Sequence, residues 1–135
     1  MEVVIGICED KLFYEQNEEG KYDIMIVHKG NKYSDYKEKK YRTGFIFDSI
    51  KLFNAHHLRV SQTDSEGNTK YGLITVNRDE EICLPCCFDK IKPYQDNVLQ
   101  AFIGKDEFYI NKWGQVYTSQ VWKITHRLVM GLHEK

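Results

Sequence analysis

The chain has 135 residues, of which 41% are apolar and 13% aromatic, and its formal net charge at pH 7 is −1. This length and composition predict one folded domain, residues 1–135, and the near-zero charge excludes a molecule-wide field that would attract nucleic acid or a membrane. The first ten residues lack the basic-then-apolar order of a secretory signal, and no apolar run approaches a membrane span. We therefore expect a cytoplasmic protein without membrane contact.

The order of apolar and polar residues predicts a mainly β fold. Short runs of Tyr, Phe, Val and Ile alternate with polar turn residues, and the connections are too short for parallel crossovers. We expect consecutive antiparallel hairpins that curl into one open barrel-like or propeller-like sheet. The expected strands, in chain order, are Val3–Cys8, Lys11–Gln16, Lys21–His28, Gly44–Phe47, Leu58–Gln62, Lys70–Val76, Glu81–Leu84, Val98–Gly104, Glu107–Asn111 and Gln115–Thr118.

The end of the chain changes to a helical period. Its apolar side chains recur along one helical stripe: Val121, Ile124, Leu128, Val129 and Leu132. Ser119 or Thr118 is placed to cap the first turn. This pattern predicts a C-terminal α-helix over about residues 119–133 that covers one face or one edge of the sheet.

An internal repeat is the most informative pattern in the sequence. The segment Phe47–Phe53, FDSIKLF, matches Phe88–Tyr94, FDKIKPY, at an offset of 41 residues. Repeat-like units therefore cover about residues 44–84 and 85–118, and a third, weaker copy begins near Lys21. One supersecondary unit has been copied two to three times.

The repeated unit resembles the WG-repeat family. The fullest copy comprises Lys70–Ile74 (KYGLI), Ile82–Pro85 (ICLP) and Phe88–Ile91 (FDKI). The likeness covers about residues 44–118, and in the last copy Phe108 takes the place of the strand glycine. The resemblance implies successive β-hairpins and a role in protein interaction, and it supplies no catalytic residues.

Three of the four cysteines lie in the segment ICLPCCFDKI. Cys83 and Cys86 have the spacing of a redox centre or of half a zinc site, but no helix follows them and a second ligand pair is missing. Cys86 and Cys87 align with Phe45 and Ile46 of the first repeat unit, so we interpret the cysteines as apolar core residues. Cys83, Cys86 and Cys87 stay secondary candidates for metal ligands, and we expect no metal and no cofactor.

The sequence gives no sign of an enzyme. It has no nucleophile elbow, no Gly-rich phosphate loop and no H-E-x-x-H motif. Asp48 and Asp89 are a candidate carboxylate pair for catalysis, but they occupy equivalent places in the repeat. We interpret each as a structural residue that accepts hydrogen bonds from the backbone N–H groups that follow it.

One insertion, Lys29–Arg42 (KGNKYSDYKEKKYR), is skewed in charge and carries interleaved tyrosines. Basic and aromatic groups together suit an acidic protein partner, and they also suit phosphates and unstacked bases. The same segment is also compatible with a solvated insertion whose tyrosines pack on the sheet. The candidate contact residues are Tyr33, Tyr36, Lys37, Lys39, Lys40, Tyr41 and Arg42.

These patterns together predict a non-catalytic binding module. We expect a small protein–protein interaction domain that acts as an inhibitor, immunity or regulatory partner. The alternative is a binder of RNA or single-stranded nucleic acid, or an inhibitor of a nucleic-acid enzyme, that uses the same insertion.

Overall fold

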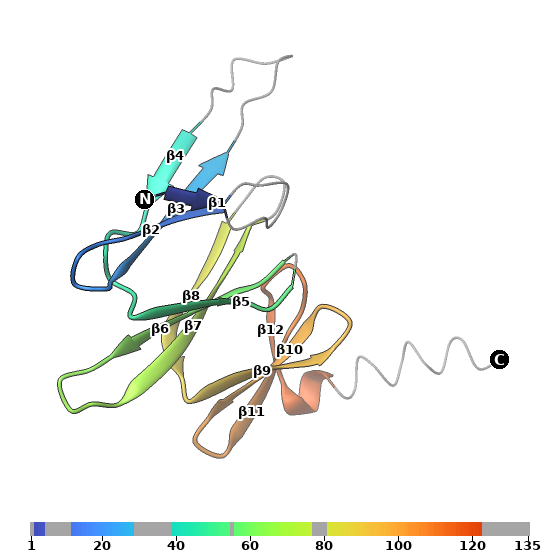
Figure 1. The fold of residues 1–135 in the computed structure, drawn as a ribbon. Coiled ribbons are helices and arrows are strands. Elements are labelled where there is room, and N and C mark those ends of the chain that lie inside the picture. Colours follow the sequence, from blue (N-terminus) through green and yellow to red (C-terminus); the bar gives the residue numbers. More distant parts are fainter. Residues whose placement is uncertain (1, 5–11, 29–38, 55, 77–80, 123–135) are drawn as a thin grey trace, which may run out of the picture.

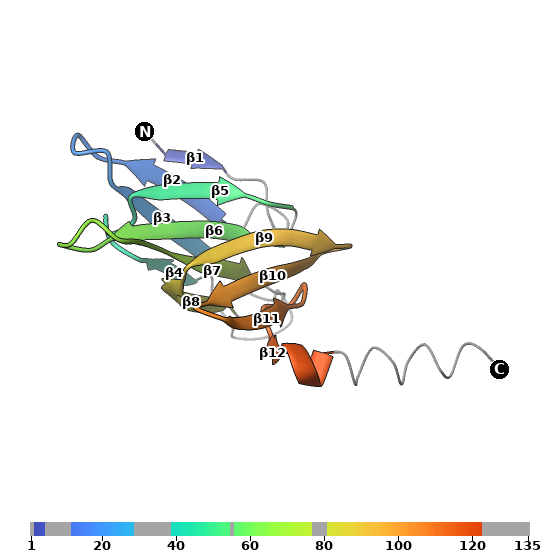
Figure 2. The same cartoon turned by 90° about the horizontal axis from the view of Figure 1, so that it is seen from below.

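The structure is a computed structural model that describes residues 2–4, 12–28, 39–54, 56–76 and 81–122. In this part of the chain the strands form three four-stranded antiparallel sheets, each a meander in chain order (Figures 1 and 2). Sheet 1 contains β1 (Glu2–Val4), β2 (Leu12–Gln16), β3 (Tyr22–His28) and β4 (Lys39–Arg42). Sheet 2 contains β5 (Ser49–Leu52), β6 (Leu58–Thr63), β7 (Thr69–Val76) and β8 (Glu81–Phe88). Sheet 3 contains β9 (Lys90–Gln95), β10 (Val98–Ile103), β11 (Asp106–Ile110) and β12 (Val116–Thr118).

The mainly β class and the antiparallel hairpins are confirmed, but the single curled sheet is wrong. The described strands belong to three separate sheets, with neither a closed barrel nor a propeller among them. Strands β4, β5 and β9 were not predicted. The predicted strand Gly44–Phe47 is absent because Gly44 has a positive φ of 86°, which turns the chain, and only Phe47 makes an isolated bridge, to Tyr22.

Sheet 2 lies between the other two sheets and contributes side chains to both interfaces. It can do so because successive side chains of a strand point to opposite faces of the sheet. Ile74 packs toward sheet 1 and its neighbour Leu73 toward sheet 3. The first interface, between sheets 1 and 2, is built from Leu12, Ile24, Ile26, Phe47, Leu58, Val60 and Ile74. The second interface, between sheets 2 and 3, is built from Leu73, Phe88, Ile91, Leu99, Ala101 and Ile110.

The chain makes equivalent backbone contacts where it leaves sheet 1 for sheet 2 and where it leaves sheet 2 for sheet 3. Tyr22 on β3 forms a bridge with Phe47, and Tyr71 on the equivalent strand β7 pairs with Phe88. The two phenylalanines are the first residues of the repeated F-D-x-I motif. The offset seen in the sequence therefore corresponds to equivalent backbone contacts at both interfaces.

Asp48 and Asp89 follow those phenylalanines, and both tie neighbouring sheets together. Asp48 accepts a hydrogen bond from the backbone N–H of Thr63 at 2.6 Å and pairs with Lys21, which directly precedes β3 of sheet 1. Lys21 and the Thr63 N–H hold the pKa of Asp48 below its ordinary value. The predicted structural role is therefore correct in kind, but the donor lies 15 residues further along the chain rather than next to the carboxylate.

Asp89 repeats this arrangement one sheet later. It accepts a hydrogen bond from the Gly104 N–H at 2.6 Å and pairs with Lys70 of sheet 2. The Gly104 N–H, followed by Lys70, lowers the pKa of the Asp89 carboxyl. Both aspartates therefore act as anchors within the repeat.

A buried histidine makes a further connection at the second interface. His57, whose side chain is fully buried, places Nε2 2.8 Å from the carbonyl oxygen of Asn111, in the turn between β11 and β12. Its Nδ1 lies 3.1 Å from Oδ1 of Asn54. Burial lowers the pKa of His57 below its ordinary value.

A helix begins at Ser119, as predicted. Thr118 caps it, because its Oγ1 accepts a hydrogen bond from the Val121 N–H at 3.3 Å. The ring of Trp122 stacks on Tyr109 of β11 with ring centroids 5.3 Å apart. The rest of the predicted helix, residues 123–133, lies outside the described part of the chain. No helix within the described residues is long and apolar enough to cross a membrane.

Candidate functional site

The predicted contact residues of the insertion fall into three groups. Tyr33, Tyr36 and Lys37 lie outside the described residues. Lys39, Lys40 and Tyr41 lie on β4, whose backbone pairs with β3. Arg42, by contrast, has a structural contact: its guanidinium lies 3.2 Å from a carboxylate oxygen of the buried residue Asp23.

Asp23 holds the chain where β4 ends. Besides Arg42, it accepts a hydrogen bond from the Gly44 N–H at 3.0 Å. Arg42 also lies 3.4 Å from Glu15 on β2. This network fixes the segment that leads from sheet 1 into sheet 2, where the groove described below begins.

The interpretation of the cysteines as core residues is wrong for Cys83 and Cys87, which are both exposed. Both lie on β8, which is the last strand in the order of sheet 2. Cys86 alone packs against the first interface. Burial, with smaller contributions from Cys87 and Asp48, raises the pKa of Cys86 to about 11, so its thiol is protonated and unreactive at neutral pH.

The aligned positions in the first repeat unit are exposed as well. Phe45 and Ile46 have 38% and 46% of their surface accessible, so an apolar residue at this place of the repeat does not mark the core. The described residues contain no group of three or more His, Cys, Asp and Glu side chains that could hold a metal ion.

Strand β8 contains a bulge, which shifts its register against β7. Tyr71 pairs with Phe88, and Leu73 pairs with Leu84, so the register shifts along β8 between these two pairs. The bulge brings the β8 backbone close to Gly72: a Cβ at Gly72 would lie 2.5 Å from the carbonyl oxygen of Leu84. Only glycine fits there, which gives a physical reason for the glycine of the KYG motif.

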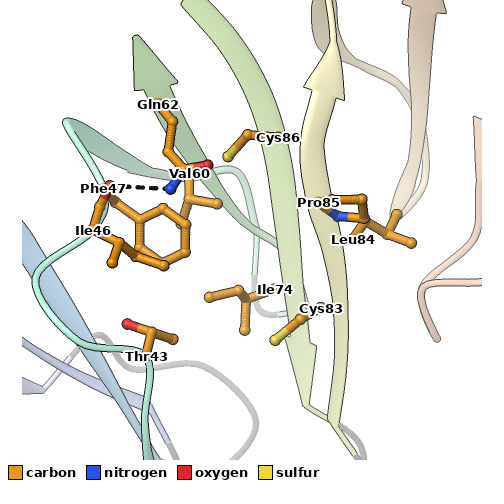
Figure 3. Close-up of a pocket in the computed structure, with 10 residues that line it drawn as sticks. All are labelled: Thr43, Ile46, Phe47, Val60, Gln62, Ile74, Cys83, Leu84, Pro85 and Cys86. Carbon is orange, nitrogen blue, oxygen red and sulfur yellow. Dashed lines mark hydrogen bonds between the residues drawn. The ribbon is translucent and has the colours of Figure 1, made fainter. Parts of the chain in front are cut away.

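Beside the bulge, an apolar groove of about 380 Å³ opens at the first interface (Figure 3). Its floor is made of core residues and its rim of exposed ones, including Ile46 and Cys83. Gln62 spans one side, where its Nε2 donates a hydrogen bond to the Ile46 carbonyl at 3.2 Å. The lining residues are Thr43, Ile46, Phe47, Val60, Gln62, Ile74, Cys83, Leu84, Pro85 and Cys86.

The second interface carries a different residue pair at the equivalent strand position. Val60 is opposite Gly72 in sheet 2, and the equivalent pair in sheet 3 is Ala101 and Phe108. Phe108 packs against the second interface, with its ring 6.1 Å from that of Phe88 in an edge-to-face contact. An aromatic side chain therefore stands where sheet 2 has a glycine and an adjoining bulge.

The apolar groove continues into a more polar hollow of about 400 Å³. The two share the lining residues Ile46, Gln62 and Cys86, so they adjoin. The polar part is lined by both lysines of the inter-sheet pairs, Lys21 and Lys70, together with Asp48 and Asp64.

The groove offers shape and apolar surface rather than reactive groups. Its aliphatic and aromatic lining suits an apolar side chain, and the Cys86 thiol is protonated at neutral pH. Sequence reasoning named Cys83 and Cys86 for other reasons and missed Ile46, Val60 and Ile74. Comparisons with known protein families, with curated proteins and with solved structures found no match to this chain.

Proposed function

We propose that the protein is a non-catalytic binding module for another protein, and that the groove at the first interface takes an apolar side chain of that partner. The groove itself carries this proposal. Its floor of Phe47, Val60 and Ile74 is buried core, yet Ile46 at the rim keeps 46% of its surface accessible. Apolar surface of this kind beside a preformed hollow is typical of binding sites.

Two further observations support the same proposal. The motifs similar to WG repeats fit a role in protein interaction, as an inhibitor, immunity or regulatory partner. The insertion proposed as a contact segment also ends beside the groove, because Thr43, which lines the groove, directly follows β4. Lys39, Lys40 and Tyr41 therefore belong to a strand that leads directly to the proposed site.

The expected affinity follows from the size of the site. Burying one aliphatic or aromatic side chain contributes about 1.5–3 kcal/mol, which corresponds to roughly a ten- to 150-fold change in Kd. The groove alone therefore supports weak binding. A stable complex needs additional contacts, which the polar hollow and the neighbouring strand β4 are placed to supply.

The test begins with peptides selected against the purified chain from a displayed library of random peptides. The groove variant is Ile46→Arg, which places a charge at the rim. The matched control is Ile103→Arg, at a residue that is similarly exposed, 39% against 46%, but lies at the end of β10 in sheet 3.

We expect the selected peptides to carry an apolar residue that their binding requires, and Ile46→Arg to weaken binding at least about tenfold. Ile103→Arg should leave the Kd unchanged. If no selected peptide distinguishes the two variants, the groove is not the binding site and the proposal is wrong.

A further inference from the structure

An arginine in sheet 2 lies on the face that looks away from the groove. Arg59 is on β6, and its neighbour Val60 lines the groove, so the Arg59 side chain points to the other face, toward sheet 3. Its guanidinium lies 4.6 Å from the ring centroid of Tyr71 and 5.7 Å from that of Phe53. The side chain is half-buried, and the two rings hold the planar guanidinium in one place.

We infer that Arg59, together with Lys51, forms a second contact surface that binds a carboxylate in an acidic segment of a partner protein. This inference goes beyond the proposed function, because the surface lies on the opposite face of sheet 2 from the groove. Its test uses other ligands and other variants, so either proposal can fail without the other.

The first argument is that the donors of Arg59 lack acceptors. Its Nε is buried and has no hydrogen-bond partner. The terminal nitrogens Nη1 and Nη2 make no hydrogen bond or ion pair with the described residues either, but they are not buried. A guanidinium has five N–H donors, and a carboxylate accepts two of them in parallel. The Nη side of Arg59 is therefore accessible to a carboxylate and is not used by the described part of the chain.

The second argument is a like charge directly across the strand pair. Lys51 on β5 is the register partner of Arg59. It is exposed, and its Nζ lies 5.8 Å from the ring centroid of Phe53, with no carboxylate among the described residues as an ion-pair partner. Like charges that face each other across two strands disfavour the pairing. A bound anion offsets this repulsion.

The third argument comes from the equivalent place in sheet 3. Gln100 stands there in the position of Arg59, 41 residues further along the chain. Its Nε2 donates a hydrogen bond to the carboxylate of Glu107. By the register of the two strand pairs, Tyr71 of sheet 2 occupies the position of Glu107. Sheet 3 thus supplies an acidic partner to its own polar residue, whereas sheet 2 has a ring in place of that acid.

The surroundings of Arg59 favour an acidic peptide over a nucleic acid. The rings of Phe53 and Tyr71 already have cations over them, whereas a base needs a free ring face for stacking. Binding to nucleic acid also depends on contacts with several phosphates along the backbone. Two adjacent cations, one of them a planar guanidinium, instead match one or two neighbouring carboxylates.

The test titrates the purified chain, at low salt, with a fluorescently labelled octapeptide of glutamate. Fluorescence anisotropy gives the Kd, and NMR of the nitrogen-15-labelled chain follows the Nε–H signal of Arg59. An octapeptide of glutamine is the uncharged control, and an octanucleotide of uridine tests nucleic acid. We expect the glutamate peptide to shift the Arg59 signal to saturation, the glutamine peptide to leave it in place, and the oligonucleotide to bind more weakly.

Three variants, each with one positive charge fewer, locate the binding. Arg59→Gln should weaken binding of the glutamate peptide at least about tenfold. Lys51→Gln, at an exposed position, should weaken it about two- to fivefold. The matched control is Lys92→Gln in sheet 3, because Lys92 is also exposed and lies 5.5 Å from the ring centroid of Phe102. This control should keep the Kd of the unaltered chain.

Equal losses in Arg59→Gln and Lys92→Gln would show unspecific attraction between charges and overturn the inference. Equal binding of the glutamate and glutamine peptides would overturn it as well. Tighter, Arg59-dependent binding of the uridine octanucleotide overturns a protein as the partner at this surface. If Arg59→Gln does not fold, the comparison of Lys51→Gln with Lys92→Gln decides in the same way.

Discussion

The two interfaces of this molecule are built from equivalent residues of a repeat, and the groove described above lies at the first of them. At the second interface Phe108 fills the space beside Phe88. At the first interface the equivalent position is Gly72, and the β8 backbone comes within 2.5 Å of where its Cβ would be. The difference follows from what comes next in the chain: β8 has to cross into sheet 3, whereas β12 pairs regularly with β11 and is followed by a helix.

The space between the sheets therefore differs at one position of the repeat, which is Phe108 at the second interface and Gly72 at the first. A residue with a bulky side chain closes it, and a glycine permits a bulge whose flank opens to solvent.

The largest effect is expected for Gly72→Ala. The new Cβ meets backbone rather than a movable side chain, with the Leu84 oxygen at 2.5 Å and the Pro85 carbonyl carbon at 3.0 Å. The strand pair β7–β8 has to separate, so we expect a loss of about 3 kcal/mol or more in the free energy of unfolding. Chemical denaturation measures it. A loss below about 1 kcal/mol would contradict the close approach of β8.

Phe108→Ala should have the next largest effect, a loss of about 2 kcal/mol from removing a partly buried ring. It should also open a cavity at the second interface and so make the two interfaces more alike. Denaturation gives the stability, and an increase in binding of an apolar fluorescent dye reports the cavity. Unchanged dye binding at a clear loss of stability would indicate that the surrounding residues collapse into the space.

A pH-dependent difference is expected at the second interface, where His57 joins two turns. Burial lowers the pKa of His57, so below its ordinary value of 6.5 the unfolded chain binds the proton more readily than the folded one. Stability should therefore fall as the pH drops through 6.5 and level off below the pKa of the folded state. His57→Gln should flatten this slope, because it removes the buried imidazole. An unchanged slope in this variant would contradict the assignment.

The smallest effect is expected for Lys21→Met, which removes the ion pair with Asp48 at the first interface. Both side chains are partly exposed, so the loss should be about 0.5 kcal/mol and should shrink with added salt. Asp48→Asn should cost more, because it also weakens the acceptor for the Thr63 N–H. Equal losses for the two variants would indicate that the backbone hydrogen bond contributes nothing.

Much of this fold was predictable because its strands carry apolar alternation. β3, β6, β7, β10 and β11 lie within one residue of their predicted ends. β4 and β9 were missed because their sequences, KKYR and KIKPYQ, are dominated by charge or contain proline, and their strand structure depends on neighbours in the sheet. Gly44–Phe47 was overpredicted because an apolar run cannot reveal the positive φ of Gly44.

The candidate site was predictable only in part. The repeat alignment placed Phe108 where the other unit has a glycine, and that is the residue that separates the two interfaces. The groove itself depends on how Phe47, Val60 and the β8 bulge meet in three dimensions. These residues are far apart in the sequence, so no local pattern indicates a hollow between them.

The most direct test of the groove as a binding site compares two cysteines on the same strand. Cys83 lines the groove and Cys87 does not, yet both are exposed. Alkylation with iodoacetamide, followed by mass spectrometry, gives the rate at each thiol with and without a saturating selected peptide. We predict that the peptide slows alkylation of Cys83 at least about tenfold and leaves Cys87 unchanged. Equal rates at Cys83 with and without bound peptide would contradict the account.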